Sequence, residues 1–217
     1  MKNLKGQTAI VTGAGSGLGK SIALKFADEG VNLALIGRDI TKLNKTAELC
    51  SKQNIAVISY ACDITDPTQI KNTYAKITQD FKVIDILINN AGIAYNKKFI
   101  EHSEEEIKRS FDTNILGLVN FTHEILPGMI DKKSGQIINI GSVLSFETWP
   151  MWTIYEATKH AVYGFTEGLR KEMEHEKTGV KVMGIYPGTI NTNIAYSNNI
   201  PDPDWSWAMN PDDIADS

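Results

Sequence analysis

The fold is decided by the stretch Thr12-Gly13-Ala14-Gly15-Ser16-Gly17-Leu18-Gly19, which joins two segments of different pattern. Residues 7–12 form a short apolar run that is typical of a strand. Residues 20–27 carry apolar side chains at helical spacing, and Gly30 ends that segment. The glycines therefore lie in a turn from a strand into a helix, where main-chain N–H groups suit a pyrophosphate and glycine allows its close approach. A tight turn without a ligand is the alternative.

The order of strand and helix repeats along the whole chain. The predicted strands are residues 7–12, 31–36, 55–61, 84–89, 136–140 and 180–185. The predicted helices are residues 20–27, 40–53, 66–80, 103–130 and 153–175. This alternation, with nearly uninterrupted apolar strands, indicates an α/β fold, a three-layer doubly wound parallel sheet of the Rossmann type. No linker divides the chain, so we expect a single domain over residues 1–217.

Composition argues against several classes of function. The net charge of −4 gives no support for binding to nucleic acid or to acidic lipid. The apolar runs are too short for a membrane span, and the N-terminus lacks the apolar core of a secretion signal, so a cytoplasmic protein is expected. Cys50, Cys62 and the 4 histidines show no ligand spacing, so no metal site is expected.

Three motifs occur in order, each in its own strand and helix context. They are Thr12-Gly13-x-x-x-Gly17-x-Gly19, Asn89-Asn90-Ala91-Gly92 and Tyr155-x-x-x-Lys159. The usual dinucleotide fingerprint, Gly-x-Gly-x-x-Gly, does not fit the first of them. Together the motifs resemble the short-chain dehydrogenase/reductase family in its short single-domain branch, over about residues 5–217. The members with the most similar organisation are 3-oxoacyl-[acyl-carrier-protein] reductases.

The resemblance implies a set of cofactor-binding residues. Those expected around the pyrophosphate are Gly13, Ser16, Gly17, Leu18 and Gly19. Those expected beneath the adenine ribose are Asn90, Ala91 and Gly92, and those at the nicotinamide carboxamide are Pro187, Gly188, Ile190 and Thr192. Asp63, followed by Ile64, matches the acidic residue that bonds the adenine amino group, with a simple turn aspartate as the alternative.

The choice between NADP(H) and NAD(H) depends on the end of the second predicted strand. A carboxylate there would bond the ribose 2′-hydroxyl of NAD and repel the 2′-phosphate of NADP. That position is Gly37, and Arg38 follows it, which favours NADP(H). Asp39 could bond the 2′-hydroxyl instead, but it is better placed to cap the next helix. The second cation of many NADP-binding members is replaced by Ser16.

Carbonyl reduction needs a proton donor beside the substrate oxygen. Tyr155 and Lys159 lie one helical turn apart, and the ammonium is expected to lower the pKa of the phenol toward 7. By resemblance both also contact the cofactor, with Lys159 on the nicotinamide ribose. Ser142 would bond the substrate oxygen, or merely cap the next turn. Asn114 would kink its helix and hold a water molecule, or merely pack.

Several features depart from the family or lie around the site. Glu156 stands where a small residue is more common, and it is expected to point away from the site. The family's last helix and seventh strand are expected to be missing after residue 217, while helices 103–130 and 153–177 remain for a homodimer or homotetramer. The expected substrate walls are residues 143–152 and 193–209, with the tryptophans of 190–210 in a lid or in an interface. The aromatic wall residues are Phe146, Trp149, Trp152, Trp205 and Trp207.

The sequence thus predicts an NADP(H)-dependent oxidoreductase that acts on a small-molecule carbonyl or secondary alcohol. Reduction of a ketone or a 3-oxoacyl thioester, with Tyr155 as the general acid, is the expected direction. One alternative is an NAD-dependent alcohol dehydrogenase of the same family. Another is a non-catalytic nucleotide-sensing or scaffold protein on the same fold, although all four positions of the chemistry are filled.

Overall fold

The computed structural model describes residues 4–51, 54–192, 194 and 208–216. Its strands are β1 (Thr8–Thr12), β2 (Asn32–Gly37), β3 (Val57–Ala61), β4 (Ile86–Asn89), β5 (Gly135–Ile140) and β6 (Val180–Ile185). Its helices are α1 (Gly17–Asp28), α2 (Ile40–Cys50), α3 (Pro67–Asp80), α4 (Glu104–Phe111), α5 (Gly117–Asp131), α6 (Thr153–His175) and α8 (Pro211–Ala215). Short helical segments are η1 (Phe99–Glu101), η2 (Asp112–Leu116) and η3 (Val143–Ser145).

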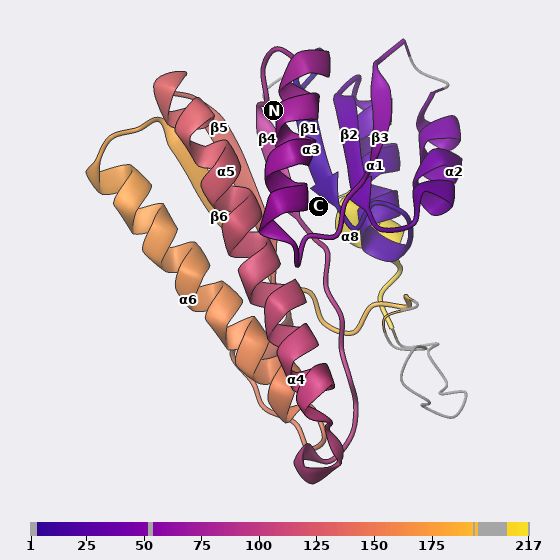
Figure 1. The fold of residues 1–217 in the computed structure, drawn as a ribbon, viewed down its shortest axis with the longest axis vertical. Coiled ribbons are helices and arrows are strands. Elements are labelled where there is room, and N and C mark those ends of the chain that lie inside the picture. The colour runs from indigo at the N-terminus through magenta and orange to yellow at the C-terminus, as the bar shows by residue number, and fades with distance from the viewer. Residues whose placement is uncertain (1–3, 52–53, 193, 195–207, 217) are drawn as a thin grey trace.

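The strands form one parallel 6-stranded sheet in the order β3-β2-β1-β4-β5-β6 (Figure 1). The chain moves outward from β1 to β3, then returns to the other side of β1 and continues from β4 to β6. This reversal leaves a crevice outside the carboxyl ends of β1 and β4, where open sheets of this kind bind their ligands. The predicted doubly wound α/β fold is confirmed.

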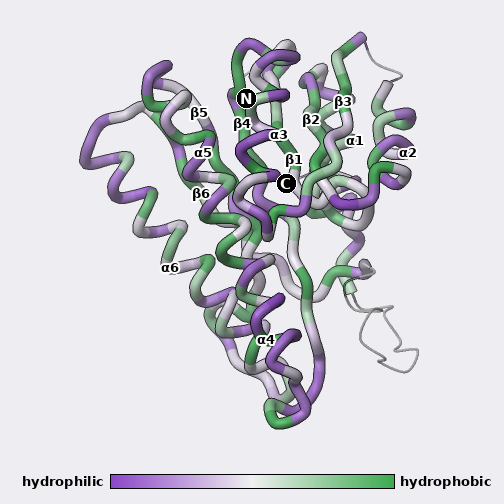
Figure 2. Tube along the Cα trace, viewed as in Figure 1, coloured by the Kyte–Doolittle hydropathy of each residue, from purple (hydrophilic) through white to green (hydrophobic). Residues whose placement is uncertain are grey.

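Alternate residues of each strand enter two separate cores. Ile10 of β1 packs in the core under α3, α5 and α6. Its neighbours Ala9 and Val11 pack in the core under α1, α2 and α8. This follows from the two-residue period of a strand that is covered on both faces. Hydrophilic and hydrophobic residues alternate along α6, as expected for a helix with one solvent face (Figure 2). No helix among the described residues is both long and apolar enough to cross a membrane.

The single helix predicted over residues 103–130 is interrupted. The π-helical segment η2 separates α4 from α5, and Asn114 lies within it, 2% exposed. The Asn114 amide accepts from the Ile93 N–H at 2.8 Å and donates to the Ile93 carbonyl at 2.8 Å, as a main-chain partner would. The widened turn, a form common at functional sites, brings this amide against the segment after β4.

The ends of four other predicted elements are also wrong. The helix predicted over residues 20–27 begins at Gly17, and the strand predicted over residues 84–89 begins at Ile86. The strand predicted over residues 55–61 begins at Val57, and the helix predicted over residues 40–53 ends at Cys50.

The last described residues return to the main body of the protein. Main-chain hydrogen bonds join Met209 to Thr189 and Asn191, so the two ends of the 190–210 segment lie together. Helix α8 then packs on α1, with Ile214 only 7% exposed. Within the described residues, β3 and β6 are the two edges of the sheet.

Candidate active site

The glycine-rich turn after β1 has the backbone shape that its sequence predicts. Gly13 and Gly17 adopt left-handed φ angles of 69° and 52°. A Cβ atom at Gly19 would lie 2.4 Å from the Gly13 carbonyl oxygen, so only glycine allows the turn to close. Ser16 precedes α1 and makes no capping hydrogen bond with its side chain, whereas Asp39, Asp66 and Ser103 cap α2, α3 and α4. The first N–H groups of α1 are thus left for an external acceptor.

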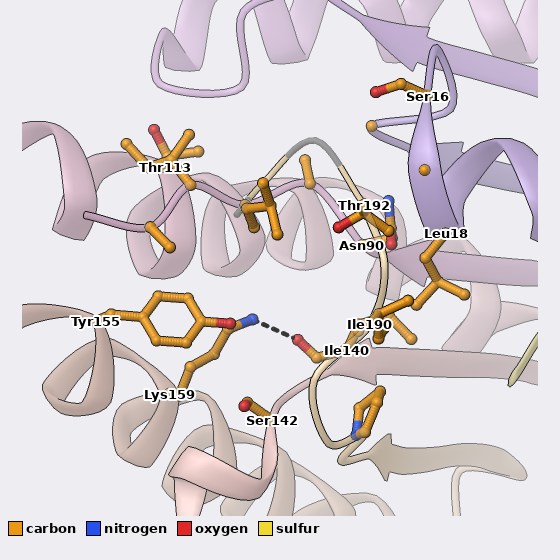
Figure 3. A pocket seen from close by; sticks show the side chains of 18 of the residues that line it. Ser16, Leu18, Asn90, Thr113, Ile140, Ser142, Tyr155, Lys159, Ile190 and Thr192 are labelled. Atoms are coloured by element: carbon orange, nitrogen blue, oxygen red, sulfur yellow. Dashed lines mark hydrogen bonds between the residues drawn. The ribbon is translucent and has the colours of Figure 1, made fainter. Parts of the chain in front are cut away.

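A cavity of about 610 Å³ begins at this turn and runs along the carboxyl ends of the strands to α6 (Figure 3). It brings together most of the predicted site residues: Gly13, Ser16, Gly17, Leu18, Arg38, Asp63, Ile64, Asn90, Ala91, Gly92, Ser142, Tyr155, Lys159, Pro187, Gly188, Ile190 and Thr192. Two predicted residues do not line it. Gly19 lies against Gly13 and Asn90 under the turn, and Asn114 lies behind Gly92.

Thr12 is a positioning residue that the sequence reasoning missed. Its hydroxyl accepts from the N–H groups of Asn90 and Ala91 at 3.0 and 3.1 Å and donates to the Ile88 carbonyl. The Asn90 side chain returns a hydrogen bond to the Thr12 carbonyl at 2.9 Å. These bonds fasten the glycine turn of β1 to the end of β4. Thr12 opens the glycine motif, but its partners lie far away in the sequence.

The charged residues at the turn end of the cavity separate into two groups. The Asp39 carboxylate caps α2 by accepting from the N–H groups of Thr41 and Lys42 at 3.0 and 3.1 Å, as the sequence suggested. Arg38, Asp39 and Lys42 all line the cavity, and Lys42 was not predicted. Asp63 lines the cavity too, and its carboxylate accepts from Thr65 within a local turn, as the turn interpretation expects, while its contact with adenine stays a prediction. Arg38 and the Lys42–Asp39 pair, with Nζ and Oδ2 4.0 Å apart, therefore face this end of the cavity.

Ser142, Tyr155 and Lys159 meet at the other end of the cavity (Figure 3). Ser142 follows β5, is 8% exposed, and accepts from the Leu144 N–H at 3.2 Å, so it does cap the next turn. Its side chain also faces the Tyr155 hydroxyl, and this polar neighbour lowers the pKa of the phenol. Burial is the larger effect and raises the pKa of Tyr155 to about 12.

Lys159 is held by the main chain. It is 5% exposed, and its Nζ donates to the Ile140 carbonyl at 2.8 Å. Burial lowers the pKa of the Lys159 ammonium to about 8. Its Nζ is 5.5 Å from the centre of the Tyr155 ring. The expected lowering of the Tyr155 pKa toward 7 by Lys159 is therefore wrong for this arrangement, because burial dominates and the ammonium is directed at Ile140.

Asn114 connects η2 to the helix that carries the tyrosine. Its Nδ2 donates to the Thr158 hydroxyl at 3.0 Å, and that hydroxyl donates to the Tyr155 carbonyl at 2.7 Å. A Cβ atom at Gly92 would be 3.4 Å from the Asn114 Oδ1, so glycine allows the close approach. The side chain of Asn114 thus positions the first turn of α6 against the segment after β4.

The expected aromatic wall is only partly present. Trp149 and Trp152 line the cavity, and Trp152 stands edge-on to Tyr155 with ring centres 5.7 Å apart. Phe146 does not line it. Its ring packs on Tyr163 and Tyr186 instead, at 4.8 and 4.9 Å. Trp205, Trp207 and most of the expected lid lie outside the described residues.

Comparison with known proteins agrees with this geometry. The profile of the short chain dehydrogenase family matches residues 7–202. The chain belongs to the short-chain dehydrogenase family. This short-chain dehydrogenase is 36% identical to an uncharacterized oxidoreductase of Staphylococcus saprophyticus, over 100% of this chain and 91% of that protein. It is an oxidoreductase.

Two solved structures of the family are similar throughout. A short-chain dehydrogenase/reductase of Burkholderia phymatum in complex with NAD has a TM-score of 0.92 and 26% identity, over 100% of this chain and 85% of the other. An alcohol dehydrogenase of Thermococcus sibiricus complexed with 5-hydroxy-NADP has a TM-score of 0.86 and 28% identity, over 97% of this chain and 87% of the other. Relatives of this short-chain dehydrogenase thus bind either nucleotide.

Proposed function

We propose that this short-chain dehydrogenase reduces a ketone to a secondary alcohol with NADPH, and that Tyr155 is the general acid. The observation that carries the proposal is one continuous cavity with two different ends. A glycine turn and an uncapped helix N-terminus form one end, and Ser142, Tyr155 and Lys159 form the other. The residues present fit a dinucleotide laid between these ends.

Each side chain has a separate task in the proposed reaction. Bound NADPH would supply the hydride to the carbonyl carbon. The carbonyl oxygen accepts hydrogen bonds from Ser142 and Tyr155, and Tyr155 then transfers its phenolic proton to that oxygen as negative charge develops. A pKa of about 12 keeps Tyr155 protonated at neutral pH, so its hydroxyl carries the proton to be donated. Lys159 holds a positive charge beside the Tyr155 ring, and its ammonium would hold a ribose hydroxyl of the nucleotide when bound.

The walls near Tyr155 support an uncharged substrate. Apolar side chains from the segment that leads into α6 line the cavity, namely those of Val143, Leu144, Trp149 and Trp152. Such walls favour apolar groups on either side of the carbonyl, because burying a charged group against them without a partner is unfavourable. We propose ketones with apolar substituents as the substrate class and include 3-oxoacyl thioesters in it.

The test is consumption of NADPH with a panel of aliphatic ketones, aryl ketones and 3-oxoacyl thioesters. Turnover of at least one member is expected. Absence of turnover with every member, with either nucleotide, would contradict the catalytic proposal and favour a nucleotide-sensing role.

Preference for NADP(H) is proposed from Arg38 and Lys42. Replacing Arg38 by alanine is expected to raise the Kd for NADPH about 10- to 100-fold, because a charge-assisted hydrogen bond contributes about 1.5–3 kcal/mol. The Kd for NADH should change less than about 3-fold, since NADH has no 2′-phosphate for the guanidinium to bond. Equilibrium dialysis with both nucleotides measures this difference.

A matched control is Arg170→Ala on α6, where Arg170 pairs with Glu167 and Glu174 and does not line the cavity. It should leave both Kd values unchanged. Tighter binding of NADH than of NADPH by the wild type would show that the preference inferred from Arg38 is wrong.

A further inference from the structure

We infer that Glu156 is a positioning residue that sets substrate selectivity by holding the tryptophan wall of the cavity. This inference rests on the proposed carbonyl reduction and concerns the same site. Glu156 directly follows Tyr155, yet it does not line the cavity. As predicted, its side chain points away from the site, but it is 7% exposed and therefore not a solvated surface carboxylate.

The buried carboxylate has a defined partner in the wall. Its Oε1 accepts a hydrogen bond from the main-chain N–H of Trp149. The described ion pairs include none at Glu156, so the carboxylate depends on this N–H. A buried carboxylate bonded to an N–H makes a charge-assisted bond, stronger than that of a neutral acceptor. Glu156 therefore ties the wall to the helix turn that carries Tyr155.

The wall needs such a fastening because its backbone is unusual. Met151, between the two tryptophans, has a φ of 73°, which a side chain other than glycine rarely adopts. Its carbonyl accepts from the Lys97 N–H at 3.0 Å. Lys97 in turn pairs with Glu106 through its ammonium. The segment from Trp149 to Trp152 is thus held from two sides, by Glu156 of α6 and by the chain after β4.

The catalytic residues have other supports. Lys159 is held by Ile140, and the Ser145 hydroxyl donates to the Lys159 carbonyl at 2.9 Å. Loss of the Glu156 side-chain bond should therefore move Trp149 while Tyr155 and Lys159 stay in place. Trp152 keeps the hydrogen bond from the Glu156 main-chain N–H to its own carbonyl, at 2.8 Å. Bulky substrates, which need the aromatic wall, should lose affinity, and small ones should not.

The kinetic test compares Glu156→Ala and Glu156→Gln with the wild type on an aryl ketone and on a small aliphatic ketone. For Glu156→Ala we expect KM for the aryl ketone to rise about 10-fold, as for the loss of one charge-assisted bond, with kcat within about 3-fold. KM for the aliphatic ketone and the Kd for NADPH should not change. Glu156→Gln, which keeps an acceptor oxygen, should restore most of the affinity. Glu147→Ala, an exposed glutamate of the same segment, is the control and should resemble the wild type.

A second measurement reads the contact without turnover. Hydrogen exchange of the Trp149 amide should be at least about 10-fold faster in Glu156→Ala than in the wild type, and close to wild type in Glu156→Gln. Unchanged exchange in Glu156→Ala, or an equal loss of kcat with both ketones, would overturn the inference. If the wild type turns over no ketone, the proposed function fails, and the exchange rates alone decide whether Glu156 holds the wall.

Discussion

Replacing Tyr155 by phenylalanine is expected to lower kcat about 10³-fold, because general acid catalysis by a positioned side chain contributes in that range. The change removes one oxygen atom and leaves the ring, so the packing against Trp152 remains. The substrate oxygen then has no proton donor at the position that the Tyr155 hydroxyl occupied. Single-turnover oxidation of NADPH with a ketone substrate measures this step directly.

The fold and the nucleotide site should survive that substitution. The Kd for NADPH is expected to change less than about 3-fold, since Arg38 and the glycine turn are untouched. The control is Tyr163→Phe, two helical turns further along α6, where the ring packs on Phe146 outside the cavity. Tyr163→Phe should keep full turnover. Equal turnover by Tyr155→Phe and the wild type would refute the assignment of Tyr155 as the acid.

Local patterns in the sequence predicted the parts of the site that are local in the structure. Tyr155 and Lys159 share one helix face because they are one turn apart. The glycine spacing predicted a turn from a strand into a helix, where Gly13 and Gly17 have left-handed φ angles, and the alternation of strands and helices predicted one parallel sheet. These inferences depend on periodicity and backbone sterics, which a single sequence contains.

Contacts between distant segments could not be predicted in the same way. Thr12 bonds Asn90, and Lys159 bonds the carbonyl of Ile140, across gaps that no periodic pattern spans. Phe146 was placed in the substrate wall because of its neighbours in the sequence, but its ring packs with Tyr186 beyond β6. Side-chain direction in irregular segments is set by such tertiary packing. The partner of Glu156 depends on the left-handed backbone of Met151, which its sequence context does not indicate.

Replacing Lys159 by methionine is expected to lower kcat about 10³-fold and also to change how stability depends on pH. Burial lowers the pKa of Lys159 from 10.5 to about 8 in the folded protein. Between about pH 8 and 10.5 the unfolded chain therefore binds a proton that the folded protein has released, so the free energy of unfolding rises with pH in this window. The full rise is about 3 kcal/mol, because one pKa unit corresponds to about 1.4 kcal/mol. Below about pH 8 both states are charged, and the unfavourable burial of the ammonium is constant.

Urea unfolding of the wild type and of Lys159→Met from pH 7 to 10.5, without added nucleotide, measures this effect as a difference. The difference is needed because Cys50 also contributes to the pH dependence of stability. Burial raises the pKa of its thiol to about 11, and this contribution is the same in both proteins and cancels. The methionine variant should lack the rise. Lys132→Met is the control. The Lys132 Nζ also donates to a main-chain carbonyl, that of Ile84 at 2.9 Å, but it is paired with Asp85 at 2.7 Å and lies at the opposite ends of the strands. Lys132→Met should keep both turnover and the alkaline rise. If Lys159→Met keeps the rise as well, the buried ammonium is not its source, and if Lys159→Met keeps turnover, Lys159 has no part in the chemistry.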